Sequence, residues 1–281
     1  TPDSTSTPSG SANGGIQTKL EGQDLQNFQY GGSSAKPITL SFYAKSGSAG
    51  AGTYSIEVRY RNSSNASFNQ TRAFTITSSW QRFTFTIEAN GAATSNDIRN
   101  SNEEGFVIIW HLASGPSDQT SAVTTWTSSN AMTTITGMDN FMSSTSNEFF
   151  LTGVQLEVGS IATDFEHRSF AQELALCCRY FYGATDVIAG IFIADNADQD
   201  AAYGGIQFPV IMRAAPTVIF GDNAGNNAGV VTQHGAAHGI AATAGDIGKH
   251  GIGKCAKNSG NWDTGSAKPI AAKIASADAE L

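Results

Sequence analysis

The charged side chains best suited to catalysis gather at one corner of the sequence. Glu166, His167 and Arg168 are adjacent, and a carboxylate beside an imidazole suits general acid–base chemistry. A working site also needs a nucleophile or a defined pocket, and the sequence indicates neither nearby. We therefore predict a structural corner, in which Phe165 enters the core and the charged side chains pair with one another or with Glu173.

A pair of carboxylates that hydrolyses glycosidic bonds is a second catalytic hypothesis. Glu103, Glu104, Glu157 and Glu166 are the residues from which such a pair would be drawn. The mechanism requires two of them at a fixed separation across one cleft, which the sequence does not define. The chain also lacks the repeats of β-helical enzymes that degrade polysaccharides. We therefore predict that the protein is not an enzyme and has no catalytic residues.

Two groups of residues have the chemistry of metal ligands. One combines three histidines with a cysteine and an aspartate: His234, His238, His250, Cys255 and Asp222. The other is an acidic loop with carboxylates of the kind that calcium binds: Asp195, Asp198 and Asp200. Glycines within HGAAH disfavour the helix that would align its histidines, and the acidic loop lacks the EF-hand pattern. We predict no metal site and no cofactor.

Aromatic residues give a better signal for ligand binding. Their rings stack on the apolar face of a sugar, and neighbouring hydroxyl and amide groups suit its rim. Trp126 lies in a long loop at 113–147, and loops of this length usually have a function or a structure of their own. Trp110 falls in an apolar run and is predicted to lie in the core. The predicted ligand-binding residues are Trp126, Tyr43 and Tyr60.

The elements that must position these residues are mostly strands. Alternating apolar and polar residues predict about eight strands in the first 160 residues, and the clearest runs from Tyr54 to Tyr60. The continuous apolar run from Phe106 to Trp110 predicts a central strand that is covered on both faces. With turn-rich connections and no βαβ rhythm, this pattern is typical of an antiparallel sandwich of jelly-roll type.

The chain changes character after residue 168. Ser169 and Gln172 have the spacing of a capping box, which predicts a short helical turn before a strand at 179–182. Alternation between Ile206 and Met212 predicts further β structure, with Pro209 at an edge or bulge.

The predicted fold is therefore all-β, with an antiparallel jelly-roll sandwich, a short helical turn and a second, smaller β domain. Residues 1–15 are predicted to be a flexible Ser/Thr/Pro/Gly linker from an N-terminal anchor that precedes this sequence. The jelly roll is expected at 16–168, the junction at 169–183 and the distal β domain at 184–281. Glycine-rich loops at 221–265 are expected to form the tip of the distal domain.

Composition disfavours several classes of partner. The 281 residues include only 14% charged side chains, and the net charge is −8. A negative chain is poorly suited to bind a nucleic-acid backbone or an anionic membrane, so we predict neither partner. No apolar run is long enough to cross a bilayer, so we expect no membrane insertion. Of the three cysteines, Cys177 and Cys178 are adjacent, which disfavours a disulfide framework.

One stretch resembles the domain junction of a known family. Residues 151–183 read LTGVQLEVGSIATDFEHRSFAQELALCCRYFYG. This stretch resembles bacteriophage virion fibre proteins, known variously as tail fibres, head fibres or capsid-decorating proteins. In that family a carbohydrate-binding-module-like jelly roll ends in a TGVQLEVG strand and a P-F-E-H-R corner, and an E-L-A-L-C-x-R-Y-Y segment follows. Here Asp164 replaces the proline, and Cys178 stands where glutamine is common.

Shorter matches extend the resemblance over residues 16–220. Residues 21–26 (EGQDLQ) resemble E-G-Q-N-L-Q, and residues 37–46 resemble P-L-T-L-S-F-W-V-K-S. Residues 208–217 resemble F-P-V-x-M-R-x-x-P-T, the opening of the family's distal domain. The resemblance is weak across 221–265.

The resemblance implies a homotrimeric virion appendage that faces the host surface and has no catalytic activity. Its implied partners are other copies of the chain, other virion proteins reached through the N-terminal anchor, and host-surface glycans. We expect the trimer contacts on the apolar face formed by Leu174, Leu176 and Cys177. The alternative hypothesis is a capsid-decorating or fibre-scaffolding structural protein with no ligand. Both hypotheses place the protein in the virion.

Overall fold

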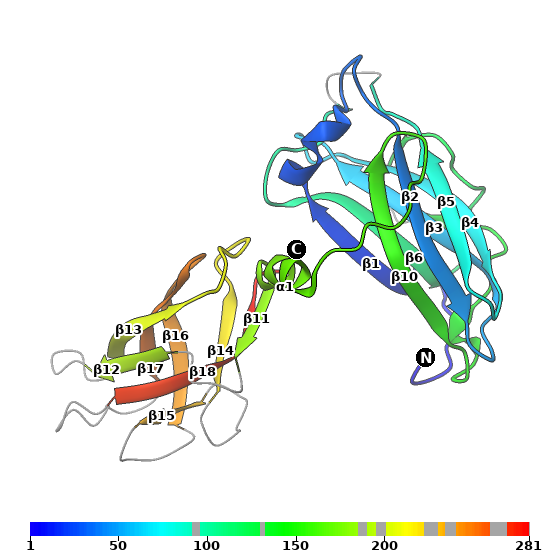
Figure 1. Ribbon diagram of the computed structural model, residues 1–281. Helices are drawn as coiled ribbons and strands as arrows, with labels where there is room; N and C mark the ends of the chain where they lie inside the picture. The colour runs from blue at the N-terminus through cyan, green and yellow to red at the C-terminus, as the bar shows by residue number, and fades with distance from the viewer. Residues whose placement is uncertain are drawn as a thin grey trace. The chain divides into compact units, whose positions relative to one another are not determined.

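The computed structural model describes residues 1–91, 96–129, 133–184, 190–194, 201–221, 230–233, 240–258 and 269–280. These residues form an all-β protein with short helices, which confirms the predicted fold class at that level (Figure 1). The chain divides into two compact units, Thr1–His167 and Arg168–Leu281.

A five-stranded antiparallel sheet forms one layer of the first unit (Figure 1). In spatial order its strands are β1 (Asn13–Glu21), β6 (Glu104–Ser114), β3 (Gly52–Arg61), β4 (Ser67–Ile76) and β8 (Thr127–Ser128). Ile56 of β3 lies opposite Trp110 of β6, and Ile16 of β1 lies opposite Trp110 on the other side. This register places the apolar residues of three neighbouring strands on one face of the sheet.

A three-stranded antiparallel sheet forms the other layer. Its order is β10 (Phe149–Val158), β2 (Ile38–Ser46) and β5 (Gln81–Ile87). The smaller elements of this unit are η1 (Gly22–Phe28), η3 (Phe141–Ser143), β7 (Gln119–Thr120) and β9 (Thr134–Ile135). β7 and β9 pair in parallel.

The core of the first unit lies between these sheets. Phe42, Tyr54, Phe106 and Trp110 are almost completely buried, and their rings pack in edge-to-face and tilted contacts. β6 is buried on both faces, as its continuous apolar run predicts.

The segment predicted as a flexible linker is bonded to the first unit instead. The backbone N–H of Ser6 donates to Met142 O at 2.8 Å, and Asn140 Nδ2 donates to Ser6 O at 2.8 Å. β1 begins at Asn13 rather than after residue 15. The composition of this segment indicated a linker. Composition does not show that residues 140–142 provide hydrogen-bond partners for the backbone of Ser6.

The second unit opens with a helix whose cap the sequence predicted. α1 spans Phe170–Cys178, and Ser169 Oγ accepts from Gln172 N while Gln172 Oε1 accepts from Ser169 N. These two reciprocal bonds form the capping box. Among the described residues, no helix has both the length and the apolar character needed to cross a lipid bilayer.

The rest of the second unit is a β structure in which strands close on themselves. Its strands are β11 (Phe181–Ala184), β12 (Gly190–Ala194), β13 (Ala201–Gln207), β14 (Thr217–Gly221), β15 (Val230–Gln233), β16 (Ile240–Gly248), β17 (Gly251–Lys257) and β18 (Pro269–Asp278). Consecutive pairing through β12, β13, β17, β16 and β15 returns to β18, which also pairs with β12. The ring encloses a core that includes Phe192, Ile206, Phe220, Ile252 and Ile270.

The strand predicted between Ile206 and Met212 ends earlier than its alternation suggests. β13 stops at Gln207, before Pro209, which has no N–H to donate to a neighbouring strand. Beyond that point single backbone bonds hold the chain: Met212 N donates to Lys249 O at 2.9 Å.

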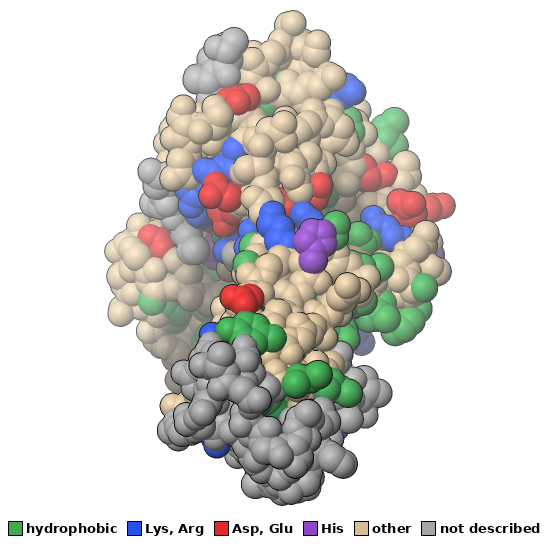
Figure 2. Space-filling view, turned by 90° about the vertical axis from the view of Figure 1, so that its left-hand side faces the viewer, with side chains coloured by type: hydrophobic (Ala, Val, Ile, Leu, Met, Phe, Trp, Pro, Cys, Tyr) green, Lys and Arg blue, Asp and Glu red, His purple; other side chains and the backbone are tan. Residues whose placement is uncertain are grey.

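The surface of the protein is poor in charge, as its composition requires. In Figure 2 much of the visible surface is tan, the colour of uncharged polar side chains and backbone, with acidic and basic side chains scattered over it. Hydrophobic side chains reach the same surface in separate places. Burial of apolar groups in these units is therefore incomplete, and the exposed groups are candidates for contacts with partners.

Candidate functional site

Trp126, which was predicted to face a ligand, contacts the core of the first unit. Its Nε1 donates to Glu88 O at 2.7 Å. Its ring centre lies 4.9 Å from that of Tyr60 and 5.9 Å from that of Tyr30, both nearly edge-to-face. The side chain is half-buried against the core. The structure therefore favours a packing role for Trp126 over an exposed platform in the loop.

Tyr60 is completely buried, so its prediction as a ligand-binding residue is wrong. Its ring stacks on Phe68 with 5.0 Å between centres, and Asn90 Nδ2 donates to its hydroxyl at 2.6 Å. Burial raises the pKa of Tyr60, so the hydroxyl stays protonated. Tyr60 alternates in phase with Ile56 and Val58, and this phase puts it on the core side of β3.

The path of the long loop explains why Trp126 turns inward. Val123 N donates to Thr71 Oγ1 at 2.9 Å, and the Arg72 guanidinium donates to Val123 O at 2.9 Å and Thr124 O at 3.0 Å. β8 then pairs with β4. The loop thereby covers the free edge of β4, which would otherwise present unpaired backbone groups. Burial lowers the pKa of Arg72.

A buried ionic cluster lies on the other face of this sheet, and the sequence analysis missed it. Glu57 Oε1 accepts from Arg59 Nη2 at 2.8 Å and from Asn69 Nδ2 at 3.4 Å. Glu57 Oε2 lies 3.0 Å from His111 Nε2 and accepts from Thr133 N at 3.3 Å. Strand alternation in the sequence places Glu57 and Arg59 on the same face of β3, and this pattern could have indicated the cluster.

The Glu57 cluster has the residue types of an acid–base site, but its members are buried. Glu57, Arg59, Asn69 and His111 are each buried. The bond from Thr133 ties the long loop to the sheet through the Glu57 carboxylate. We interpret the cluster as a satisfied buried network that anchors the loop, because an unpaired carboxylate at this depth would be strongly destabilising.

Tyr43 is the predicted ligand residue that lies on an outward-facing sheet surface. It belongs to β2 of the three-stranded sheet and is half-buried. The guanidinium carbon of Arg82 lies 5.8 Å from the centre of its ring. Arg82 also donates to Ser41 Oγ at 3.3 Å and to Thr163 O. Tyr43 and Arg82 therefore form an ordered aromatic and cationic pair at the surface.

The charged corner forms an ion pair, as predicted, but its phenylalanine does not enter the core. Arg168 Nη1 lies 3.3 Å from Glu173 Oε1, and both side chains are about half exposed. Phe165 is exposed and packs edge-to-face on His167 at 5.0 Å. The geometry gives these residues surface contacts and no catalytic arrangement.

The predicted trimer residues are exposed on α1. Leu174 is 50% exposed, Leu176 is 47% exposed and Cys177 is also exposed. Phe170, in the first turn, is 81% exposed. Within the described part of the single chain, these four side chains of α1 are therefore only partly covered.

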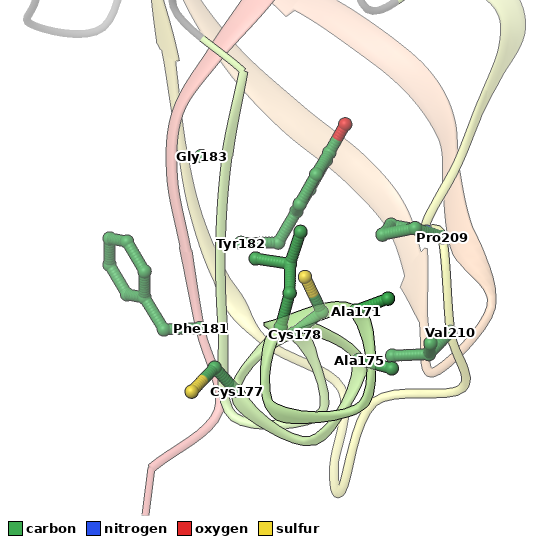
Figure 3. Close-up of a pocket in the computed structure, with 10 residues that line it drawn as sticks. Ala171, Ala175, Cys177, Cys178, Phe181, Tyr182, Gly183, Pro209 and Val210 are labelled. Carbon is green, nitrogen blue, oxygen red and sulfur yellow. The ribbon is translucent and has the colours of Figure 1, made fainter. Parts of the chain in front are cut away.

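A groove lies beside this helix within the second unit (Figure 3). It has a volume of about 600 Å³, and its walls are almost entirely apolar. Cys178 of α1 and Phe181 and Tyr182 of β11 are among the side chains that line it. Pro209 and Val210 form its far wall. The groove is shaped for apolar side chains and has little to fix a polar ligand.

The candidate metal ligands that lie in the described part of the chain do not form a site there, since it contains no group of three or more metal-binding side chains. His250 is exposed in the turn after β16. Cys255 is completely buried, and burial raises its pKa to about 12, so it remains a thiol. The other candidates lie outside the described residues: Asp195, Asp198, Asp200, Asp222, His234 and His238.

Comparison with known proteins does not assign this chain to a family. No model of a protein family matches it, and no curated protein matches it by sequence. A functional hypothesis consequently depends on the surfaces described above and on the stretch at 151–183.

Proposed function

We propose that this chain is a structural protein of a bacteriophage virion, a trimeric fibre or appendage that attaches to host-surface glycans. The exposed apolar side chains of α1 carry the proposal. Phe170, Leu174 and Leu176 are large apolar side chains on a short helix, and all are exposed. Leu174 and Leu176 are already about half buried, so complete burial would add roughly half of the ~1.5–3 kcal/mol that a fully exposed side chain contributes, and Phe170 would add most of it. Phe170 and Leu174 lie one turn apart on the same side of α1, so three copies of the chain gain this contribution from these two side chains when their helices meet at a common axis, whereas Leu176 lies on the opposite side.

Two further features support the proposal. The helix lies within residues 151–183, the stretch that resembles the domain junction of virion fibre proteins. The first unit has two antiparallel layers, of five and three strands, and a carbohydrate-binding-module-like jelly roll is likewise a two-layered antiparallel fold. Weak glycan contacts, one set on each subunit, would combine through the trimer into firm attachment.

A capsid-decorating or fibre-scaffolding protein with no ligand is the second candidate. The sheet surface of the second unit favours it, because Ile191 and Ile193 of β12 and Tyr203 of β13 are also exposed. Side chains of this kind suit contacts with neighbouring virion proteins more than contacts with sugars.

Sedimentation of the complete chain tests the trimer. We expect a trimer for the wild type and a monomer for the double variant Leu174→Asp with Leu176→Asp. Ile161→Asp is the matched control, since it places the same charge on an exposed apolar residue of the first unit and should remain trimeric. A monomeric wild type, or a double variant that stays trimeric, would refute this part of the proposal.

Electron microscopy with labelled antibodies on phage particles tests the location. Labelling of tail or fibre positions supports attachment. Labelling confined to the capsid lattice supports the second candidate. Particles that carry no label overturn both.

A further inference from the structure

Three side chains from three neighbouring segments form an exposed patch on the three-stranded sheet of the first unit. Lys45 Nζ lies 5.4 Å from the centre of the Trp80 ring and 5.1 Å from the centre of the Phe150 ring. Trp80 is 48% exposed and Phe150 is 41% exposed. We call Trp80, Lys45 and Phe150 the aromatic–lysine patch.

Strand register builds this patch. Phe42 and Ala44 of β2 face the core, so Tyr43 and Lys45 face outward. Phe150 of β10 lies directly opposite Lys45. On the other side of β2, Gln81 of β5 lies opposite Ala44, which places Trp80 beside Lys45. Lys45 and Phe150 therefore lie on paired strands, and Trp80 immediately precedes the first paired residue of β5.

The lysine in the patch has no ionic partner among the described residues. The carboxylate of Glu148, a nearby acidic group, lies against Gly47 instead. An exposed cation–π contact stabilises a protein by about 0.5–1 kcal/mol. This small stabilisation does not account for the exposure of two large aromatic rings. The patch thus combines two exposed aromatic faces with one unpaired positive charge.

We propose that the aromatic–lysine patch binds an acidic saccharide. The sugar ring stacks on Trp80 or Phe150, and the sugar carboxylate accepts a hydrogen bond from the Lys45 ammonium group. Aromatic faces suit the apolar side of a sugar ring, and an ammonium group forms a charge-assisted hydrogen bond with a carboxylate. This inference rests on the proposed glycan attachment, and it names the site and the ligand class.

Tyr43 and Arg82 extend the site along β2. Residues 43 and 45 lie on the same face, about 7 Å apart along an extended strand. The Arg82 guanidinium lies over the Tyr43 ring and is positioned by Ser41 Oγ and Thr163 O. A second aromatic and cationic pair therefore follows the first, and a chain of acidic sugars meets matching chemistry at two consecutive positions.

Binding of acidic oligosaccharides to the full-length chain tests the inference. The probes are oligogalacturonides and oligosialic acid, each compared with its methyl ester, which keeps the sugar rings and removes the charge. We expect the acidic forms to bind at least about tenfold more tightly than the esters, with an affinity that falls as salt is added. Titration calorimetry and quenching of tryptophan fluorescence measure both effects.

Variants of the patch locate the binding. Lys45→Met keeps most of the aliphatic stem and removes the charge, and Trp80→Ala removes one ring. Each should weaken binding of the acidic probe at least about tenfold. Lys36→Met makes the same change of charge at an exposed lysine just before β2 and should leave binding unchanged. Circular dichroism of every variant confirms that the fold is retained.

Three outcomes would overturn the inference: no binding of either acidic probe, equal binding of acid and ester, or full binding by Lys45→Met and Trp80→Ala. The last two leave glycan attachment intact and only move its site or change its ligand class. Conversely, a monomeric chain that still binds acidic sugars through the patch would refute the trimer and preserve this inference.

Discussion

Replacing Trp126 with alanine distinguishes a core role from a ligand role for this residue. Trp126 contacts the rings of Tyr60, Tyr30 and Phe106, with centres 4.9, 5.9 and 6.4 Å away. It also makes the 2.7 Å bond to Glu88 O. Alanine loses all of these contacts and leaves space beside the aromatic core.

The magnitude follows from the burial of the ring. Truncating a core tryptophan to alanine costs roughly 3–5 kcal/mol, and a half-buried ring belongs at the lower end of that range. Loss of the bond to Glu88 adds about 1 kcal/mol. We therefore expect Trp126→Ala to lower the free energy of unfolding by about 3–4 kcal/mol. A domain of this size is usually stable by only about 5–15 kcal/mol.

Trp80→Ala is the matched control for the same chemical change. Trp80 is exposed and makes a cation–π contact with Lys45. Removing the Trp80 ring should therefore lower the free energy of unfolding by no more than about 1 kcal/mol. Urea denaturation followed by circular dichroism measures both variants, and the transitions of the two units are fitted separately. Equal stability of Trp126→Ala and Trp80→Ala would refute the core assignment and restore Trp126 as a ligand candidate.

Three further predictions concern charge, capping and thiol reactivity. Burial alone would raise the pKa of Glu104, but hydrogen bonds from Arg61 (2.9 Å) and Lys19 (3.3 Å) outweigh burial and lower its pKa in the folded state. These bonds stabilise the fold above the unfolded pKa and are lost as pH falls through the folded pKa. Glu104→Gln should therefore cost about 1 kcal/mol at neutral pH and little in acid, by urea denaturation at both; an equal cost at both would contradict this. Ser169→Ala should destabilise α1 by about 1 kcal/mol, seen as faster amide exchange in its first turn, and unchanged exchange would contradict the cap. Cys255 should resist alkylation in the folded protein and react in urea, which mass spectrometry measures, because its thiol is buried with a pKa of about 12; rapid native labelling would contradict this.

The sequence was sufficient where the signal is local. The alternation from Tyr54 to Tyr60 predicted β3, and the apolar run from Phe106 to Trp110 predicted a strand covered on both faces. The cap at Ser169 was also predicted, because a capping box involves only neighbouring residues. In each case the chemistry that decides the structure lies within a few positions of the chain.

Strand alternation in the sequence also indicates which side chains face the core, and it would have corrected the prediction for Tyr60. Tyr60 shares its phase with Ile56 and Val58, which marks it as a core residue, whereas Tyr43 has the opposite phase to Phe42. A period of two residues therefore separates the buried tyrosine from the outward-facing one.

The aromatic–lysine patch could not be predicted from local patterns. Phe150 meets Lys45 only because β10 pairs with β2, and this register depends on contacts between segments far apart in sequence. For Trp126 the distant partners have the opposite effect. Its loop was predicted to be exposed, but bonds that join Val123 of the loop to Arg72 and Thr71 hold the loop so that the Trp126 ring faces the core. Where the deciding partner is distant, residue type and spacing do not fix the role of a side chain.

The surfaces proposed for assembly and for recognition involve different residues in this chain, so the two proposals can be separated experimentally. The exposed apolar side chains of α1 belong to the second unit, and the aromatic–lysine patch belongs to the first. Leu174→Asp with Leu176→Asp should therefore leave the affinity for a short acidic oligosaccharide unchanged in solution. The same variant should lose binding to a surface densely coated with that sugar, by as much as about 10²–10⁴-fold, because a monomer has no avidity. Ile161→Asp should behave as the wild type in both assays. Equal surface binding by the double variant would show that attachment does not depend on several subunits acting together, and the trimer would then serve only the architecture of the particle.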